Sequence, residues 1–411
     1  MLRIIIFAFM AITCVMFAGE VEEKLRKIAR DDYWDTSSLR PEITRQTLIQ
    51  SIEMARAYYL NHQNQEGNFI YALDIANGDI IEKDNQVRQA GALWGLSSLN
   101  RDRFNEPTRR AVLLGINFYS STVTTIATGE KVFVYKEDEH VETGAVALYC
   151  LALIEFLRGQ SKYLDEKTRK NYLDILNIHL EYLQSQEQKD GSWARATNVE
   201  TAFRDTSSSP YFDGEALLAY CKAARYFDRK DLLERVDYAL PLLAKKYTYE
   251  AWKSNKESDM TKGFCQWGSM AAAEYVEAGF EKHRELAANM SFALSKWLLY
   301  INQVESKTGN TGYAVEGLLG SYRIAKVLGD EQAQKLFKDA SLRIMSNLMT
   351  WQYKGPFMKF NSNLATLKTP VKGADGGITM TRNSTLVRID VVQHQLHAML
   401  MMLEHLFPEN K

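Results

Sequence analysis

The chain has 411 residues, of which 46% are hydrophobic and 25% are charged, and its formal net charge is −1. Its 7 prolines and 23 glycines exclude a collagen-like or proline-rich scaffold, and the composition is that of a globular protein. Proteins that bind nucleic acids by neutralising phosphates carry a basic excess, so we expect no nucleic-acid partner here.

Residues 1–19 have the features of an export signal. Arg3 supplies the positive charge, residues 4–17 are almost all apolar, and two small residues end the segment. The apolar run is short for a membrane span. We therefore predict a signal peptide, and a periplasmic or secreted protein with no integral membrane span after cleavage; an uncleaved N-terminal anchor is the alternative. The match to a lipoprotein box is poor, so lipid attachment at Cys14 is not expected.

Three cysteines follow the predicted signal, namely Cys150, Cys221 and Cys265. An odd and sparse set of this kind does not indicate a disulfide framework. Cys150 and Cys221 lie in apolar helical stretches, so we predict that they are small buried side chains.

Two kinds of predicted helix alternate along the rest of the chain. The first kind has an apolar stripe with spacings of three and four residues, as at Leu48, Ile52 and Ala55, which indicates one buried and one wet face. We place these helices at 43–62, 107–121, 166–187, 230–245, 281–303 and 331–350. The second kind is apolar on every side, as at residues 90–96, which indicates a helix surrounded by protein. We place these at 86–99, 141–158, 212–228, 265–279, 312–328 and 388–406.

The alternation predicts an all-α fold, an (α/α)6 toroid with about six inner and six outer helices. We expect one domain over residues 20–411, with short strand-like pieces in the long loops. The long loops, such as 63–85 and 351–387, lead into the inner helices, so all of them lie on one face of the ring. Helix N-termini bring partial positive charge and free N–H groups to that face, which suits an anionic or polyhydroxylated ligand.

Two of these loops contain a glycine followed two residues later by an aromatic residue. Gln63, Gly67 and Phe69, together with Gly191 and Trp193, resemble the QW-type motif of terpenoid cyclases, prenyltransferase-like chains and other α/α toroids. Glycine permits a tight turn and the aromatic ring packs back on the barrel, so the motif is chiefly structural. The order of helices resembles that of six-hairpin glycosidase-like toroids. This resemblance implies glycoside hydrolysis, polysaccharide elimination or sugar epimerisation at the mouth where the inner helices begin.

Toroids of the terpenoid-cyclase, prenyltransferase and lanthionine-cyclase kinds are a further alternative. Their Asp-rich motif or zinc-binding residues are not matched in this sequence, and Cys265 resembles only one ligand of such a site. We therefore expect no metal and no cofactor.

Three acids at the starts of inner helices are predicted to be catalytic, namely Asp84, Glu142 and Glu215. In glycoside hydrolysis one carboxylic acid protonates the leaving oxygen, and a second carboxylate activates water. We predict that Asp84 forms this pair with Glu142 or with Glu215. The alternative is that each acid only caps its own helix. In that case the protein is a non-catalytic cell-envelope protein that binds or assembles glycans or peptides.

Further polar and aromatic residues at the same mouth are predicted to bind a carbohydrate or another polar ligand. Arg88 lies one turn inside a helix of small apolar residues, where a charge needs a partner or a ligand. Asp390 and His394 are one turn apart and share a helix face. Aromatic side chains stack on the apolar faces of sugar rings. The predicted set is Arg88, Gln89, His140, Tyr211, Asp213, Trp267, Tyr313, Arg388, Asp390 and His394.

Overall fold

The structure is a computed structural model that describes residues 41–136, 138–367 and 371–409. The predicted signal peptide lies outside the described residues. From Thr44 on, the chain forms one compact unit, and everything below concerns that unit.

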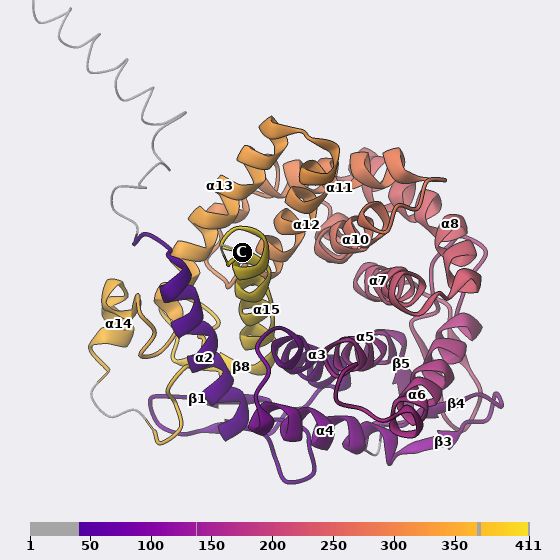
Figure 1. Cartoon of the computed structure of the whole chain (residues 1–411), viewed down its shortest axis with the longest axis horizontal. Helices are drawn as coiled ribbons and strands as arrows, with labels where there is room; N and C mark the ends of the chain where they lie inside the picture. The colour runs from indigo at the N-terminus through magenta and orange to yellow at the C-terminus, as the bar shows by residue number, and fades with distance from the viewer. Residues whose placement is uncertain (1–40, 137, 368–370, 410–411) are drawn as a thin grey trace, which may run out of the picture. The chain divides into compact units, whose positions relative to one another are not determined.

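Two concentric rings of helices make up this unit (Figure 1). The inner helices are α3 (Gln86–Asp102), α5 (Thr143–Gly159), α7 (Pro210–Phe227), α10 (Asp259–Glu277), α12 (Gly312–Leu328) and α15 (Ile389–His405). Each inner helix packs against the next, and α15 packs against α3, so the ring is closed. The outer helices are α2 (Arg45–Asn61), α4 (Glu106–Ser120), α6 (Glu166–Ser185), α8 (Lys230–Lys245), α11 (Arg284–Tyr300) and α13 (Glu331–Leu348). The predicted (α/α)6 toroid is confirmed.

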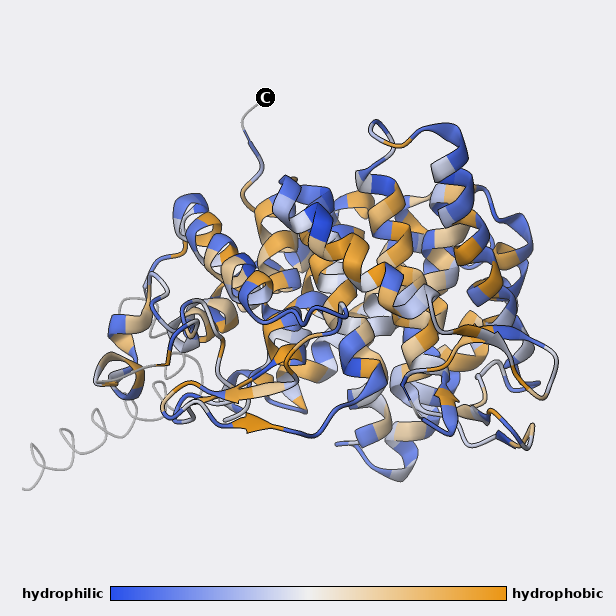
Figure 2. Cartoon of the chain, turned by 90° about the horizontal axis from the view of Figure 1, so that it is seen from below, coloured by the Kyte–Doolittle hydropathy of each residue, from blue (hydrophilic) through white to orange (hydrophobic). Residues whose placement is uncertain are grey.

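The two kinds of helix differ in burial as the sequence patterns predict. Every residue of α5 from Thr143 to Leu157 is buried, whereas α6 buries a single stripe that includes Leu176, Leu180 and Leu183. The bands of hydrophilic and hydrophobic residues along the helices are visible in Figure 2. The inner helices therefore supply the core, and the outer helices shield it from water.

Small antiparallel sheets form in the long loops, as predicted. β1 (Ala72–Asp74) lies between β2 (Ile80–Ile81) and β8 (Leu386–Arg388); β3 (Val123–Thr125) pairs with β4 (Lys131–Phe133); and β6 (Ala196–Asn198) lies between β5 (His140–Glu142) and β7 (Arg204–Asp205). β5 leads directly into α5 and β8 into α15. The sheets therefore fix how the chain enters these inner helices. Shorter helices are η3 (Lys246–Glu250), α9 (Ala251–Ser254), η4 (Val304–Ser306), η5 (Met349–Trp351), η6 (Met358–Phe360) and α14 (Ser362–Ala365).

Inner helix α10 begins at Asp259, earlier than the predicted start at 265. The hydroxyl of Ser258 caps the helix by accepting hydrogen bonds from the backbone N–H groups of Met260 and Thr261. The first turn of α10 is mostly polar, so the apolar pattern of this helix begins several residues after its true start. The prediction therefore placed the start of the helix too late.

The two glycine–aromatic loops are attached to the inner ring in the same way. The backbone N–H of Phe69 donates to Oε1 of Gln89 (2.8 Å), and that of Trp193 donates to Oδ1 of Asp213 (2.9 Å). In both loops the acceptor lies in the first turns of the next inner helix. The glycine two residues before the aromatic residue has φ of 116° in one loop and 79° in the other, a backbone conformation that glycine adopts without strain. The geometry agrees with a structural role for the motif.

Replacing Trp193 with alanine should destabilise the fold strongly. The side chain is 1% exposed and packs edge-on against Tyr220, so its removal leaves a large cavity. We expect a loss of about 3–5 kcal/mol in the free energy of unfolding, measured by denaturant titration. Tyr249→Ala is the control, because Tyr249 is 57% exposed. An unchanged unfolding midpoint for Trp193→Ala would contradict the structural role.

Cys150, Cys221 and Cys265 are free and buried, as predicted for the first two. Within the described residues, no helix combines the length and the apolar character that crossing a membrane requires.

Candidate functional site

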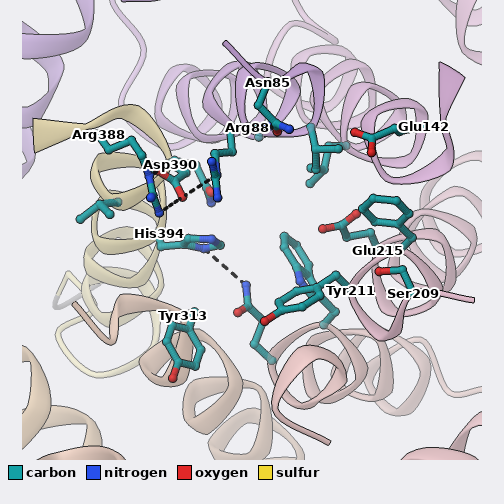
Figure 3. A pocket seen from close by; sticks show the side chains of 18 of the residues that line it. Asn85, Arg88, Glu142, Ser209, Tyr211, Glu215, Tyr313, Arg388, Asp390 and His394 are labelled. Atoms are coloured by element: carbon teal, nitrogen blue, oxygen red, sulfur yellow. Dashed lines mark hydrogen bonds and ion pairs between the residues drawn. The ribbon is translucent and has the colours of Figure 1, made fainter. Parts of the chain in front are cut away.

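A cavity of about 500 Å³ opens at the end of the ring where the inner helices begin. Residues from the first turns of all six inner helices, or from just before them, line it (Figure 3). The prediction that these helix starts converge on one mouth is therefore confirmed. Of the predicted site residues, the structure brings the following to the cavity: Arg88, Glu142, Tyr211, Glu215, Trp267, Tyr313, Arg388, Asp390 and His394.

Glu215 is a buried carboxyl group on the cavity wall. It lies in the first turns of α7, and the residue is 3% exposed. Within the described part of the chain, its Oε2 atom has no hydrogen-bond partner. A β-carbon at position 144 would lie 2.5 Å from this oxygen, so Gly144 provides the space that the carboxyl group occupies. Burial raises the pKa of Glu215 well above its usual value, and the negative charge of Glu142 raises it further. The raised pKa favours the protonated form of Glu215.

Glu142 is the last residue of β5 and occupies the N-cap position of α5, where its side chain makes no capping hydrogen bond. The backbone N–H of Glu142 donates to Oε1 of Gln86 (3.1 Å), which fixes the end of the strand. Burial raises the pKa of Glu142, although the positive charge of Arg195 opposes this shift. Glu142 makes no side-chain capping hydrogen bond and Glu215 lies inside α7, so hydrogen-bonded capping does not account for these two acids.

Opposite this pair of carboxyls lies a group that we call the arginine cluster: Arg88, Asp390 and Arg388 (Figure 3). Arg388 holds Asp390 with two hydrogen bonds, Nε to Oδ1 at 2.5 Å and Nη2 to Oδ2 at 2.8 Å. Arg88 approaches the same carboxylate (Nε to Oδ2, 3.3 Å) and donates to the hydroxyl of Tyr71. Asp390 is thus the partner that the charge of Arg88 requires. The ion pairs hold the guanidinium groups of Arg88 and Arg388 in fixed positions beside the cavity.

His394 is held by a buried glutamate that the sequence analysis missed. Glu316 of α12 is fully buried and lies 2.9 Å from Nδ1 of His394 and 2.7 Å from Nδ1 of His397. Burial lowers the pKa of His394, but the charge and hydrogen bond of Glu316 outweigh this effect and raise it. Because a carboxylate accepts at Nδ1, the proton of neutral His394 lies on that nitrogen, and Nε2 is left as the acceptor.

Gln393 is a second residue that the sequence analysis missed. It lines the cavity and is 2% exposed. Among the described residues, its Nε2 amide group has no hydrogen-bond partner. A buried donor without an acceptor is costly, and no contact within the described residues offsets that cost. Its signal in the sequence is weak, because Gln393 stands among other polar residues of α15, next to His394 and Gln395.

The predicted catalytic residue Asp84 does not line the cavity. Its carboxylate accepts hydrogen bonds from Gln89 (2.8 Å) and Tyr135 (2.7 Å) and forms an ion pair with Lys136. Burial raises its pKa, but these donors outweigh the effect, and the pKa is lowered. The adjacent residue, Asn85, caps α3 and lines the cavity instead. We therefore leave Asp84 out of the proposed mechanism.

Three predicted binding residues also lie outside the cavity. Gln89 and Asp213 hold the two glycine–aromatic loops, as described above, and both are buried. Tyr247 donates a second hydrogen bond to Asp213. Burial raises the pKa of Asp213 to about 6, although these hydrogen bonds oppose the shift. His140 is exposed on β5 and, together with Asp84, lines a separate groove.

Within the described residues, no group of three or more His, Cys, Asp or Glu side chains is arranged to hold a metal ion.

No protein-family model matches the chain, and no curated protein matches it in sequence. Several solved structures match its fold. A D-mannose isomerase has a TM-score of 0.58 and 14% identity, covering 88% of this chain and 98% of that one. Cellobiose 2-epimerase from Bacillus thermoamylovorans has a TM-score of 0.58 and 12% identity, with the same coverage.

A glycoside hydrolase family 76 mannosidase from Bacteroides thetaiotaomicron has a TM-score of 0.57 and 11% identity, covering 87% of this chain and 100% of that one. At such low identity the likeness concerns the fold alone. The chain has the (α/α)6 toroid fold, and the solved structures that share this fold include sugar epimerases, a sugar isomerase and a glycoside hydrolase.

Proposed function

We propose that the protein is a carbohydrate-active enzyme of the glycoside hydrolase type that acts on an oligosaccharide or polysaccharide. Glu215 serves as the general acid and Glu142 as the general base. The observation that carries this proposal is the placement of Glu215, a buried carboxyl group on the cavity wall whose pKa is raised well above its usual value, beside a second carboxyl group, that of Glu142. Acid–base cleavage of a glycosidic bond requires one carboxyl group that gives up a proton and a second that accepts one.

In the proposed reaction, Glu215 donates its proton to the glycosidic oxygen as the bond from that oxygen to the anomeric carbon breaks. Glu142 removes a proton from the water molecule that attacks the anomeric carbon. The raised pKa of Glu142 makes it a stronger base than an exposed glutamate. After the reaction Glu142 carries the proton and Glu215 is ionised, and exchange with solvent restores the starting state.

The groups opposite the two carboxyls bind and orient the sugar. Arg88 and Arg388 are fixed by Asp390 and donate to sugar hydroxyls. Nε2 of His394 accepts a hydrogen bond from a further hydroxyl. Tyr211 and Tyr313 supply the ring surfaces against which the sugar lies.

Replacing Arg88 with alanine should abolish ligand binding and leave the fold intact. Its side chain is 38% exposed, so little core packing is lost, while Asp390 keeps its bidentate partner Arg388. We expect binding too weak to measure by calorimetry and an unfolding midpoint close to that of the wild type. Unfolding of the variant would show that Arg88 is only a structural ion partner.

A screen of the purified chain against cell-envelope and dietary polysaccharides tests the proposal. The assay follows new reducing ends, unsaturated products and thermal shift. The proposal expects new reducing ends with at least one saccharide, and their loss in Glu215→Gln. Thermal shifts without products would favour the non-catalytic glycan-binding alternative, and unsaturated products would show elimination instead of hydrolysis.

Sugar epimerisation or isomerisation is a second candidate function, because the pairing of His394 with Glu316 provides a base that could remove a proton from a sugar carbon. Turnover in D₂O separates the two chemistries. Hydrolysis leaves the carbon-bound hydrogens in place, whereas proton transfer at carbon introduces deuterium.

The variant His394→Asn gives a second test of these functions. If His394 only binds substrate, as we propose, KM should rise and kcat should fall little. If His394 is the base at carbon, kcat should fall by about 10²–10⁴-fold and the deuterium in the product should disappear. Steady-state kinetics with the best substrate from the screen decides between these results.

Export to the periplasm or the medium also remains a proposal, supported by the sequence of residues 1–19. Mass spectrometry of the protein purified from its native host checks it. We expect a mature chain that begins after residue 19, and an intact Met1 would contradict signal cleavage.

A further inference from the structure

A second concave region, which we call the side groove, adjoins the cavity. It lies between the start of α3 and the sheet β5-β6-β7 and has a volume of about 470 Å³. Asn85 and Glu142 line both the cavity and the side groove. The side groove therefore adjoins the cavity at these two residues, with Glu142 on the boundary between them.

An exposed aromatic ring lies on the wall of the side groove. Phe203, in the turn between β6 and β7, is 65% exposed. The turn is held by backbone hydrogen bonds, including one from the N–H of Asn198 to the carbonyl of Phe203 (2.8 Å), and its backbone reverses at Ala202, where φ is 61°. The fold therefore does not use the ring for packing. A large apolar ring kept in water beside a groove is suited to stack on the apolar face of a ligand.

The side groove and the cavity differ in charge. Carboxyl groups dominate the groove wall: Asp84, Asp138, Glu139, Glu142 and Asp205. Among the described residues that line it, there is no lysine or arginine. The cavity, in contrast, is lined by Arg88, Arg195, Lys262 and Arg388. Lys136 pairs with Asp84, whereas the exposed carboxylate of Glu139 and that of Asp205 accept hydrogen bonds from hydroxyl and ammonium groups and repel anions. The side groove therefore disfavours a negatively charged ligand.

We propose that the side groove is a second saccharide subsite, in which a sugar ring without negative charge stacks on Phe203. Glu142 then lies at the junction with the sugar in the cavity. This inference rests on the function proposed for the cavity, and it predicts that the substrate is at least a disaccharide. The carboxylates of Glu139 and Asp205 accept from the hydroxyl or amino groups of that second ring.

Three matched trisaccharides test the proposal by calorimetric titration of the full chain. They are cellotriose, its glucosamine counterpart and its glucuronic acid counterpart, which share β-1,4 linkage and ring configuration and differ in charge. We expect saturable binding of the neutral and amino trisaccharides and weaker binding of the uronic one. The difference in affinity between the uronic trisaccharide and the other two should shrink at high salt, because salt screens exposed charges.

Variants then locate the binding. Phe203→Ala should weaken binding of the neutral trisaccharide about tenfold, the size of one lost aromatic contact. Phe360→Ala is the matched control, because Phe360 is 43% exposed and does not line the groove. The double variant Glu139→Gln, Asp205→Asn should reduce the discrimination against the uronic trisaccharide. Equal binding of all three sugars, no saturable binding, or unchanged binding by Phe203→Ala would each overturn the subsite.

This test is independent of turnover. If Phe203→Ala weakens binding but Glu215→Gln leaves cleavage intact, the mechanism proposed for the cavity fails and the subsite stands. If aryl monosaccharide glycosides are cleaved with dependence on Glu215 while Phe203→Ala changes nothing, the subsite fails and the mechanism stands.

Discussion

Replacing Glu215 with glutamine should reduce turnover by about 10²–10⁴-fold while the fold persists. Glutamine has nearly the same shape and fills the space beside Gly144, but it cannot donate a proton to the leaving oxygen. KM should change little, because the groups opposite the carboxyls remain. Steady-state kinetics with the best substrate from the screen measures the effect. Glu200→Gln is the control, because Glu200 is an exposed glutamate outside the cavity.

The same variant should be more stable than the wild type above pH 4.5. The pKa of Glu215 is raised in the folded state from its ordinary value of 4.5. As pH rises through that value, the unfolded chain releases the proton while the folded chain retains it, so the wild type loses stability. Glutamine does not titrate and avoids this loss. The difference in unfolding midpoint should grow from pH 4.5 towards neutral pH, and a less stable variant would contradict a buried protonated carboxyl.

Removal of the Glu274 carboxylate should cause a large loss of stability. Glu274 is buried near the ends of the inner helices, and it contacts Lys222 (3.3 Å), Arg225 (2.6 Å) and Arg323 (3.1 Å). Lys222 also pairs with Glu155 at 2.6 Å. These residues belong to α5, α7, α10 and α12, so the network joins four inner helices across the interior of the ring.

Glu274→Ala leaves buried cations without their partner and should cost about 3–5 kcal/mol in the free energy of unfolding. Glu281→Ala provides the control. Its ion pair with Arg284 is exposed, and such pairs contribute about 0–1 kcal/mol. Denaturant titration compares the two variants. Similar small losses of unfolding free energy in Glu274→Ala and Glu281→Ala would show that the buried network contributes no more to stability than a surface ion pair.

The same network predicts acid sensitivity. Burial raises the pKa of Glu274, but the charges of Lys222, Arg323 and Arg225 outweigh it and place the pKa well below 4.5. The stabilisation is present above pH 4.5, where the unfolded state is ionised as well. It is lost as pH falls from 4.5 towards the lower pKa of the folded state, because the unfolded chain then binds the proton first. The wild type should therefore lose stability in this range more steeply than Glu274→Gln.

The pattern of hydrophobic residues predicts most of this fold. The inner helices are buried on every side and the outer helices on one side only, so the two rings have different patterns. The all-apolar stretch of α5 and the single stripe of α6 leave clear patterns in the sequence, and the long loops identify the face at which the cavity opens. Helix starts are less predictable. The early turns of α10 are polar, so only the hydroxyl of Ser258 marks the true beginning.

The site is less predictable, because spacing places a residue on a helix but does not determine which neighbour it contacts. Asp84 and Asn85 are both good cap residues, and only the structure shows that Asn85 caps α3 and faces the cavity. Glu316 stands alone among apolar residues, and a buried charge requires partners. Its partners, His394 and His397, lie on a different inner helix far along the chain, so the sequence pattern does not identify them.

Titration of the Glu215 carboxyl group tests the central claim most directly. Carbon-13 NMR of glutamate-labelled protein, with Glu215→Gln used to assign the signal, follows its protonation with pH. We predict a pKa well above 4.5 that falls in Glu142→Gln, because the neighbouring negative charge is then absent. A pKa near 4.5, or one that does not respond to Glu142→Gln, would contradict the proposed acid–base pair.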